Sequence, residues 1–426
     1  MLAPARWTDR RRTTTGSVVL AVACGLVLVT VLSLLARFAL APVGATAPTR
    51  TLASGDRLVG GGRFGAQAAE SPAFQDWLAR GRVPSAALPY AAMARTALAD
   101  LHALTLQNGG VIASFQPQWR YVWPRDSAFA AVALARTGHP RDAVDALQFL
   151  QRVQAHDGSF EARYRPDGSP VVDGRGGQED DPGWALWAVD AVLAAEPPAA
   201  RDKVAGSLHP LVRRSLARLV SRTAGPGGLP PAGSDYWEVR ESRLTLGIAA
   251  PALAGLYAGS RLAAAWDPAL AKAAGARATR LRSSIEVEFG SSGYSRYAGG
   301  RGPDAAVTFL LPPYLDTPLN GAPEAARAAV PKLRQPAGGV SPGSTWPRRD
   351  GVSWTPETAL FMLASAESGD TVDATNWLTW LSRHVAAGGS LPEKVRSDGR
   401  AGSVAPLAWT DALVLLTLDR LDQLQP

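Results

Sequence analysis

The strongest candidates for chemistry in this chain are two glutamates: Glu238, which follows a tryptophan, and Glu393, in a loop between two predicted helices. Glu238 ends the segment YWE (236–238), and Glu393 precedes the segment PLAW (406–409). A carboxylic acid buried beside an indole has a raised pKa, as a general acid at neutral pH requires. Glycoside hydrolysis uses one protonated carboxyl and one ionised carboxylate on opposite sides of the sugar. Glu238 and Glu393 are candidates for such a pair, although each alone could be a solvated carboxylate or a salt-bridge partner.

The segment YVWPRD (121–126) has the composition of a sugar clamp. Trp123 offers a flat face for a pyranose ring, and Arg125 and Asp126 offer groups that bind hydroxyls. The same segment could simply begin a helix, with Asp126 as the N-cap. Taken alone, the segment supports both interpretations equally.

The segment QEDDPGW (178–184) places more polar side chains at a predicted helix start. We expect Asp181 to be the N-cap, because it precedes a proline suited to the first helical position. Gln178 and Asp180 then remain as candidate ligands for hydroxyl groups.

The positive charge of the chain is concentrated near its beginning. The sequence has 44 Lys and Arg against 37 Asp and Glu, a net charge of +7, and residues 1–50 contain six Arg and one Asp. The nearly neutral remainder gives no electrostatic basis for nucleic-acid binding. One cysteine excludes a thiolate metal site, and the five histidines contain no HxxxH pair. We therefore expect neither a metal ion nor a cofactor.

An uncharged, apolar stretch at residues 17–36 is long enough to cross a bilayer core of about 30 Å. The arginines before it predict a cytoplasmic basic tail (1–16), a transmembrane anchor (17–41) and an extracytoplasmic domain. The alternative is a cleaved signal segment, which would make the protein secreted. Residues 42–70 are rich in Ala, Pro and Gly and are predicted to be a flexible linker. We expect a single-pass protein of the cell membrane.

Apolar spacing and proline positions predict an all-α domain over residues 71–426. The predicted helices lie near 71–80, 88–106, 126–138, 140–155, 182–195, 199–223, 243–265, 267–288, 303–311, 322–332, 355–368, 371–386 and 409–424. Alternating, strand-like patterns are confined to short pieces at 111–115 and 159–164. The absence of a repeat at fixed spacing favours a closed (α/α)6 toroid over an open solenoid.

Four segments, in order, resemble motifs of glycoside hydrolase family 15, which includes glucoamylases, glucodextranases and some bacterial trehalases. They are YVWPRD (121–126), YWEVR (236–240), LPE (391–393) and PLAW (406–409), with weaker support from DAAV (304–307) and GVSWTPETA (351–359). The resemblance covers about residues 85–425. It implies an (α/α)6 barrel that releases a terminal sugar, glucose, from α-linked oligosaccharides or polysaccharides by an inverting, exo-acting mechanism.

The resemblance also implies roles for individual residues. Glu238 matches the general acid and Glu393 the base that activates water. The positions that match sugar-binding residues are Trp123, Arg125, Asp126, Gln178, Asp180, Trp237 and Trp409.

One segment departs from the family pattern. STWP (344–347) stands where family members often carry an Arg-Tyr pair, so we consider Arg348 and Arg349 as substitutes. We expect short oligosaccharides rather than long starch chains as substrates. The alternative function is a non-catalytic (α/α)6 protein that binds envelope glycans.

Overall fold

A computed structural model describes residues 72–84 and 89–425 of the chain. The predicted tail, membrane segment and linker (1–70) lie outside these residues, so their predictions stay untested. Within the described ranges, no helix is both long and apolar enough to cross a membrane.

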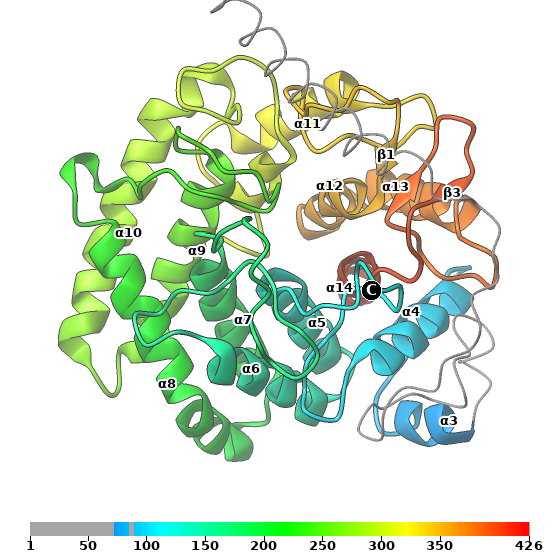
Figure 1. The fold of residues 1–426 in the computed structure, drawn as a ribbon, viewed down its shortest axis with the longest axis horizontal. Coiled ribbons are helices and arrows are strands. Elements are labelled where there is room, and N and C mark those ends of the chain that lie inside the picture. Colours follow the sequence, from blue (N-terminus) through cyan, green and yellow to red (C-terminus); the bar gives the residue numbers. More distant parts are fainter. Residues whose placement is uncertain (1–71, 85–88, 426) are drawn as a thin grey trace, which may run out of the picture. The chain divides into compact units, whose positions relative to one another are not determined.

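Six helical hairpins form a closed ring (Figure 1). The inner elements are α5 (Pro124–Arg136), α7 (Asp181–Ala195), α9 (Leu246–Ala263), the 3₁₀ helix η3 (Ala305–Leu310), α12 (Thr355–Glu367) and α14 (Ala408–Leu424). The outer elements are α4 (Ala91–Leu104), α6 (Pro140–Val153), α8 (Pro198–Arg222), α10 (Pro268–Glu288), α11 (Ala322–Leu333) and α13 (Thr371–Arg383). Each inner element contacts the next one, and α14 returns to contact α5. This closure confirms the predicted toroid and contradicts the solenoid.

Hydrophobicity decides which helices are inner and which are outer. Every residue of α5 except the last is buried, as expected for a helix surrounded by others. The outer helix α6 instead buries one stripe, with Ala143, Ala146, Leu147 and Leu150 at helical spacing. Short helices outside the ring are α3 (Pro72–Leu78), η1 (Pro226–Gly228) and η2 (Gly290–Ser292).

The N-caps of three helices differ in how well the sequence predicts them. The pair Asp267-Pro268 predicts an N-cap at Asp267, and this cap is confirmed, because the Asp267 side chain accepts a hydrogen bond from the Leu270 amide at 2.9 Å. The predicted caps at Asp181 and Asp126 are wrong. Asp181 is the first residue of α7, and Asp126 lies in the first turn of α5, which begins two residues earlier at Pro124. In both helices the proline is accommodated inside the first turn, and the cap position moves toward the N-terminus.

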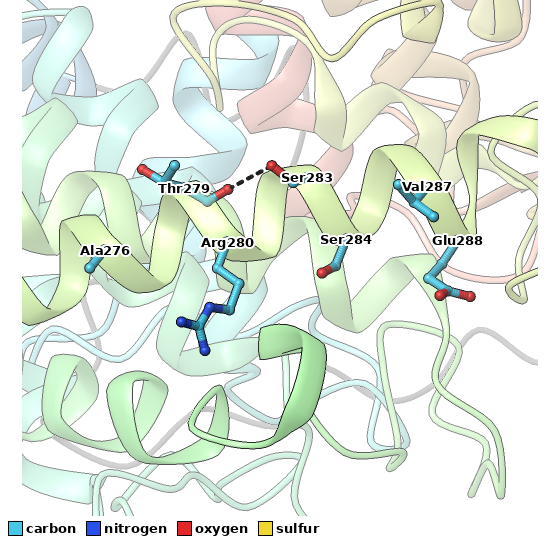
Figure 2. Close-up of a pocket in the computed structure, with 7 residues that line it drawn as sticks. All are labelled: Ala276, Thr279, Arg280, Ser283, Ser284, Val287 and Glu288. Atoms are coloured by element: carbon cyan, nitrogen blue, oxygen red, sulfur yellow. Dashed lines mark hydrogen bonds between the residues drawn. The ribbon is translucent and has the colours of Figure 1, made fainter.

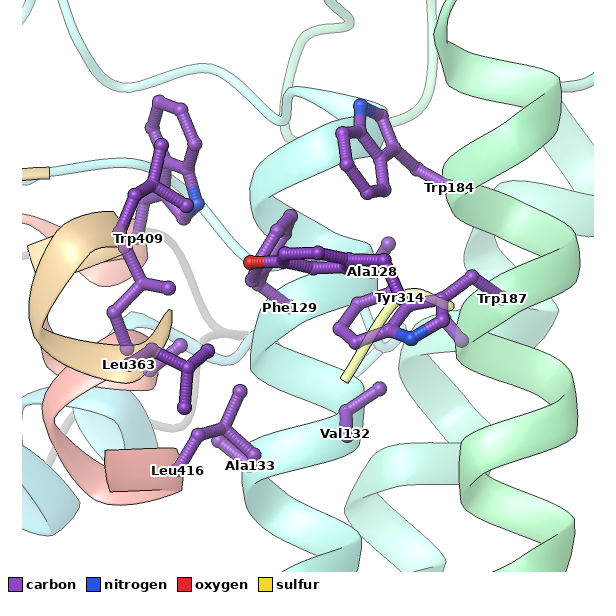
Figure 3. Packing of buried hydrophobic residues seen from close by; sticks show 14 of the residues in the cluster. Ala128, Phe129, Val132, Ala133, Trp184, Trp187, Tyr314, Leu363, Trp409 and Leu416 are labelled. Carbon is purple, nitrogen blue, oxygen red and sulfur yellow. The ribbon is translucent and has the colours of Figure 1, made fainter. Parts of the chain in front are cut away.

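Aromatic side chains fill the centre of the ring (Figure 3). The ring of Phe129 on α5 lies 4.9 Å from Trp187 and 5.7 Å from Trp409, measured between centroids. Tyr314, from the loop after η3, lies 5.2 Å from Trp187. The toroid is therefore a packed core and not an open channel, and Trp409 forms part of that core.

A small antiparallel sheet stands beside the ring, with strands β1 (Ser353–Trp354), β2 (Lys394–Val395) and β3 (Ala401–Gly402). Trp354 pairs with Lys394, which in turn pairs with Gly402. The strand-like pieces at 111–115 and 159–164 form only isolated bridges, in which Val122 pairs with both Ile112 and Tyr164. These pairings fix the backbone immediately before Trp123 and immediately after Glu393.

Candidate active site

A cavity lies where three inner helices begin. It contains about 450 Å³ of space not filled by protein atoms. Its lining residues are Ala113, Trp119, Trp123, Arg125, Asp126, Tyr236, Glu238, Trp354, Pro356, Glu357, Glu393, Leu407 and Trp409. The structure thus brings together both proposed catalytic glutamates and four of the predicted sugar-binding residues, although they are far apart in the sequence.

Arg125 is held rigidly on one side of this cavity. Its guanidinium lies 4.3 Å above the ring of Trp409 and donates a hydrogen bond of 3.0 Å to the Asp126 carboxylate. It also donates to the Gln178 side-chain oxygen and to the Tyr236 carbonyl, each at 3.5 Å. Burial raises the pKa of Asp126 above its ordinary value, and the charge of Arg125 opposes that rise. The pair therefore presents a fixed donor and a fixed carboxyl to a ligand.

Glu238 occupies a tight turn with an unusual backbone conformation. Its amide donates to the Asp235 carbonyl at 2.7 Å, and its φ of 56° lies in the left-handed region. A non-glycine residue in this region is strained by about 1–2 kcal/mol and persists only where the surroundings enforce it. The Glu238 side chain is 21% exposed and forms an ion pair with Arg175. The carboxylate therefore faces the cavity and a guanidinium and is not fully buried against an indole.

A buried network behind the turn enforces that conformation. Asp235 accepts hydrogen bonds from the Trp237 amide at 3.0 Å and from the Thr245 hydroxyl at 2.7 Å. Arg296, whose side chain is 1% exposed, lies 3.0 Å from Asp235 and 3.3 Å from Asp304. Arg296 also lies 2.9 Å from the Glu241 carboxylate, and its guanidinium stacks 3.5 Å above the Trp237 ring. Asp304 in turn accepts a hydrogen bond from the Tyr236 hydroxyl.

Glu393 is held in place by the small sheet and its neighbouring turns. Its amide donates to the Val404 carbonyl at 2.8 Å, and its carbonyl accepts from the Thr355 amide at 3.0 Å. The carboxylate accepts a hydrogen bond from Ser403 and lies 3.2 Å from the Lys394 ammonium. Ser403 also has a left-handed φ, of 63°. Strained backbone therefore occurs beside both glutamates, as is common at functional sites.

Several buried polar atoms of the lining have no hydrogen-bond partner in the protein. They are Trp123 Nε1, Arg125 Nε, Glu357 Oε2 and Trp409 Nε1. Leaving such groups unpaired costs about 1–3 kcal/mol each, so native structures rarely tolerate several together without a ligand or water. Three donors and one carboxyl oxygen around one small cavity suit a ligand rich in hydroxyl groups.

Three predicted sugar-binding residues do not line the cavity. Trp237 packs edge-on against Trp346, with centroids 4.9 Å apart, and against Arg296. Gln178 and Asp180 are buried behind Arg125, and Asp180 accepts a hydrogen bond of 2.9 Å from the Trp184 indole. Their place behind the lining suits a supporting role, and direct sugar contact by any of the three stays a prediction.

The two arginines considered as substitutes for the family's Arg-Tyr pair lie away from the cavity. Arg348 and Arg349 are exposed and are not among the lining residues, so neither replaces that pair here. Trp346 instead packs between Trp237 and Trp354. In the described part of the chain, no group of three His, Cys, Asp or Glu side chains is arranged to hold a metal ion.

Sequence reasoning missed Glu357, Trp119 and Trp354. The first of these had a recognisable signal. In Trp354-Thr-Pro-Glu357 an acidic residue follows a tryptophan by three positions, as it does in Trp123-Pro-Arg-Asp126. Both acids are the third residue of an inner helix that begins at the cavity.

A second hollow lies along the outer helix α10 and is larger, at about 820 Å³ (Figure 2). All of its lining residues come from this one helix: Ala276, Thr279, Arg280, Ser283, Ser284, Val287 and Glu288. Its lining residues include one carboxylate and no tryptophan. Size alone therefore does not mark the functional site.

The resemblance to glycoside hydrolase family 15 implies a closed ring of six helical hairpins. In this structure, two glutamates and several tryptophans lie where inner helices of such a ring begin. The structure is similar to a wild-type glycosidase, with a TM-score of 0.66 and 23% identity over 78% of this chain and 97% of that one. It is similar to a bacterial glucoamylase complexed with acarbose, with a TM-score of 0.66 and 18% identity over 82% of this chain and 58% of that one. A family 15 glucoamylase from Hypocrea jecorina gives a TM-score of 0.59 and 18% identity over 75% of this chain and 68% of that one. The expected likeness is thus confirmed at the level of the fold.

Sequence comparison reaches less of the chain. No protein-family model matches it. An uncharacterised glycosyl hydrolase of Methanocaldococcus jannaschii is 35% identical over 98 residues, which are 22% of this chain and only 16% of that protein.

Proposed function

We propose that this protein is an inverting, exo-acting glycoside hydrolase that releases glucose from the ends of α-linked oligosaccharides. The observation that carries the proposal is the cavity itself. Two glutamates from separate loops face it, and unpaired donors on Trp123, Arg125 and Trp409 surround it. The glycosidase and glucoamylase names of the proteins that share the fold support a glycoside hydrolase reaction.

In the proposed reaction, Glu238 donates a proton to the glycosidic oxygen of the leaving group. Glu393 accepts a proton from a water molecule, whose oxygen attacks the anomeric carbon from the opposite face. The carbon–oxygen bond to the leaving group breaks as the new bond forms, so the configuration inverts. Arg125 and Asp126 hold hydroxyls of the terminal sugar, and the indoles of Trp123 and Trp409 lie beside its ring.

Substitution of the two glutamates tests this assignment. Glu238→Gln and Glu393→Gln keep the size and most hydrogen bonds of each side chain but remove the acid and the base. We expect hydrolysis of maltose and longer α-glucosides to fall by about 10²–10⁴-fold in each variant, the usual contribution of a general acid or base. Glu324→Gln is the control, because Glu324 is 69% exposed in a surface ion pair with Arg327.

Two outcomes would contradict the proposal in different ways. Wild-type rates in both variants would show that the pair does not catalyse the reaction. Binding of maltose without hydrolysis by the wild-type protein would favour the glycan-binding alternative, which keeps the tryptophans but needs no acid and base.

We also propose that residues 17–41 anchor the protein in the cell membrane and leave the ring outside the cytoplasm. The uncharged stretch and the arginines before it support this placement. Separation of membrane and soluble fractions from cells that express the full chain tests it. Recovery of an intact full-length chain in the cytosolic fraction would contradict it.

A further inference from the structure

The Glu357 side chain is an unexplained carboxyl in the wall of the cavity. It is 4% exposed, and its Oε2 atom has no hydrogen-bond partner. It lines the cavity together with Glu238 and Glu393, yet the acid–base mechanism needs only those two. A buried polar atom without a partner is costly unless a ligand or water satisfies it.

The surroundings of Glu357 determine its protonation state. The charged groups that act on it are Arg125 from α5, and Glu393 and Lys394 from the segment that enters β2. Burial is the largest effect and raises the pKa of Glu357 to about 8, with a further rise from Glu393 and an opposing effect from Arg125 and Lys394. At neutral pH the side chain is therefore largely a neutral acid, which can both donate and accept a hydrogen bond.

We propose that Glu357 binds a hydroxyl group of the terminal sugar and does so as a neutral acid that donates a hydrogen bond. This inference rests on the proposed function, because it places Glu357 in the same sugar site. Its position in the first turn of α12 supports the assignment, since α12 is a rigid inner helix that holds the carboxyl at the cavity wall. The role is one of binding, and no proton is transferred from Glu357 during hydrolysis.

The pH dependence of sugar binding tests this inference. The probe is D-glucose, titrated calorimetrically into the full-length protein in detergent between pH 7 and pH 9. Since the binding-competent acid is lost as pH rises through about 8, the affinity should be about tenfold weaker at pH 9 than at pH 7. Glu357→Gln keeps a donor and an acceptor but cannot ionise, so its affinity should stay nearly constant across this range.

A matched control lies on the same helix. Glu367 is also largely buried, and burial raises its pKa, but it pairs with Arg420 at 3.3 Å and is not among the cavity residues. Glu367→Gln should keep both the affinity and the pH dependence of the wild type. Thermal unfolding of each variant establishes that it is folded at both pH values.

The remaining outcomes separate this inference from the proposed function. An unchanged pH dependence in Glu357→Gln would overturn the inference, whether or not maltose is hydrolysed. Glucose binding with the expected pH dependence but no hydrolysis of maltose would leave the inference standing and contradict the proposed reaction. If neither glucose nor maltose binds at any pH, both are wrong.

Discussion

At the scale of single residues, the site depends on planar groups stacked in fixed positions. The Arg125 guanidinium stacks on the Trp409 ring and donates a hydrogen bond to the Asp126 carboxylate, and its Nε atom has no partner. A lysine could carry the same charge, but it has no planar face and no second donor in a fixed direction. The geometry of the guanidinium, and not its charge alone, is therefore expected to matter for sugar binding.

This argument predicts the effect of Arg125→Lys. We expect kcat/KM for maltose to fall by about 10–100-fold, mostly through KM, because hydrogen bonds from a charged group contribute about 1.5–3 kcal/mol. Arg152→Lys is the control, since Arg152 also stacks on an aromatic ring, that of Phe149 at 5.6 Å, but is exposed on the outer helix α6. Equal kinetics in the two variants would mean that Arg125 does not contact the substrate.

The residue types of the site could be predicted from the sequence, but the direction of each side chain could not. Glu238 was found because it follows Trp237, and Glu393 because LPE (391–393) and PLAW (406–409) resemble family motifs; both do face one cavity. The family resemblance implies that Trp237 lines the same cavity. The turn conformation at Glu238 instead leaves Trp237 on the side of Arg296, and such a conformation depends on buried contacts from distant segments.

At the scale of structural elements, Arg296 connects the Glu238 turn to the rest of the ring. It joins Asp235 of the turn to Asp304, which caps η3 by accepting a hydrogen bond of 2.8 Å from the Ala306 amide. Removing a buried cation leaves its carboxylate partners uncompensated, which usually costs 3–5 kcal/mol. The turn that holds Glu238 would lose its main support as well.

Arg296→Met therefore should lower both stability and activity. We expect the free energy of unfolding, measured in urea, to fall by about 3–5 kcal/mol. Activity should also fall without urea, where the variant is still folded. Arg327→Met should change stability by less than about 1 kcal/mol, because the Arg327–Glu324 pair is 68% and 69% exposed. A similar small change for Arg296→Met would contradict the proposed support role.

Helix positions were predictable because their signals are local. Most predicted helices match within a few residues, and proline and apolar spacing set their starts. The element predicted at 303–311 is only the 3₁₀ helix η3, since Pro312 and Pro313 follow directly and prevent its extension. The pair Thr355-Pro356 predicts an N-cap at Thr355, but Thr355 is the first residue of α12, and its hydroxyl bonds across to Pro392 and Thr410.

At the scale of the whole molecule, buried carboxyls make stability depend on pH. Burial raises the pKa of Asp180 to about 7 and that of Glu357 to about 8. A carboxyl whose pKa is higher in the folded state stabilises that state fully below its unfolded pKa, and this contribution is lost as pH rises to the folded pKa. His139 has the opposite effect, because burial lowers its pKa to about 4, but its contribution changes only below about pH 6.5.

The protein should consequently unfold more easily at pH 8 than at pH 6.5. Glu357 alone accounts for about 2 kcal/mol of this loss, at about 1.4 kcal/mol per pH unit. Thermal or urea unfolding of the wild type and of Glu357→Gln measures it, and the variant should lose less stability over this interval. Identical losses in the two proteins would mean that the protonation of Glu357 contributes nothing to the pH dependence of stability over this interval.

The central claim is that the ring carries an inverting hydrolase. Proton NMR of the sugar first released from maltotriose by the wild-type protein tests it most directly, before mutarotation mixes the anomers. Attack by water activated at Glu393, on the face opposite Glu238, predicts β-glucose. First release of α-glucose would contradict inversion at this pair of glutamates.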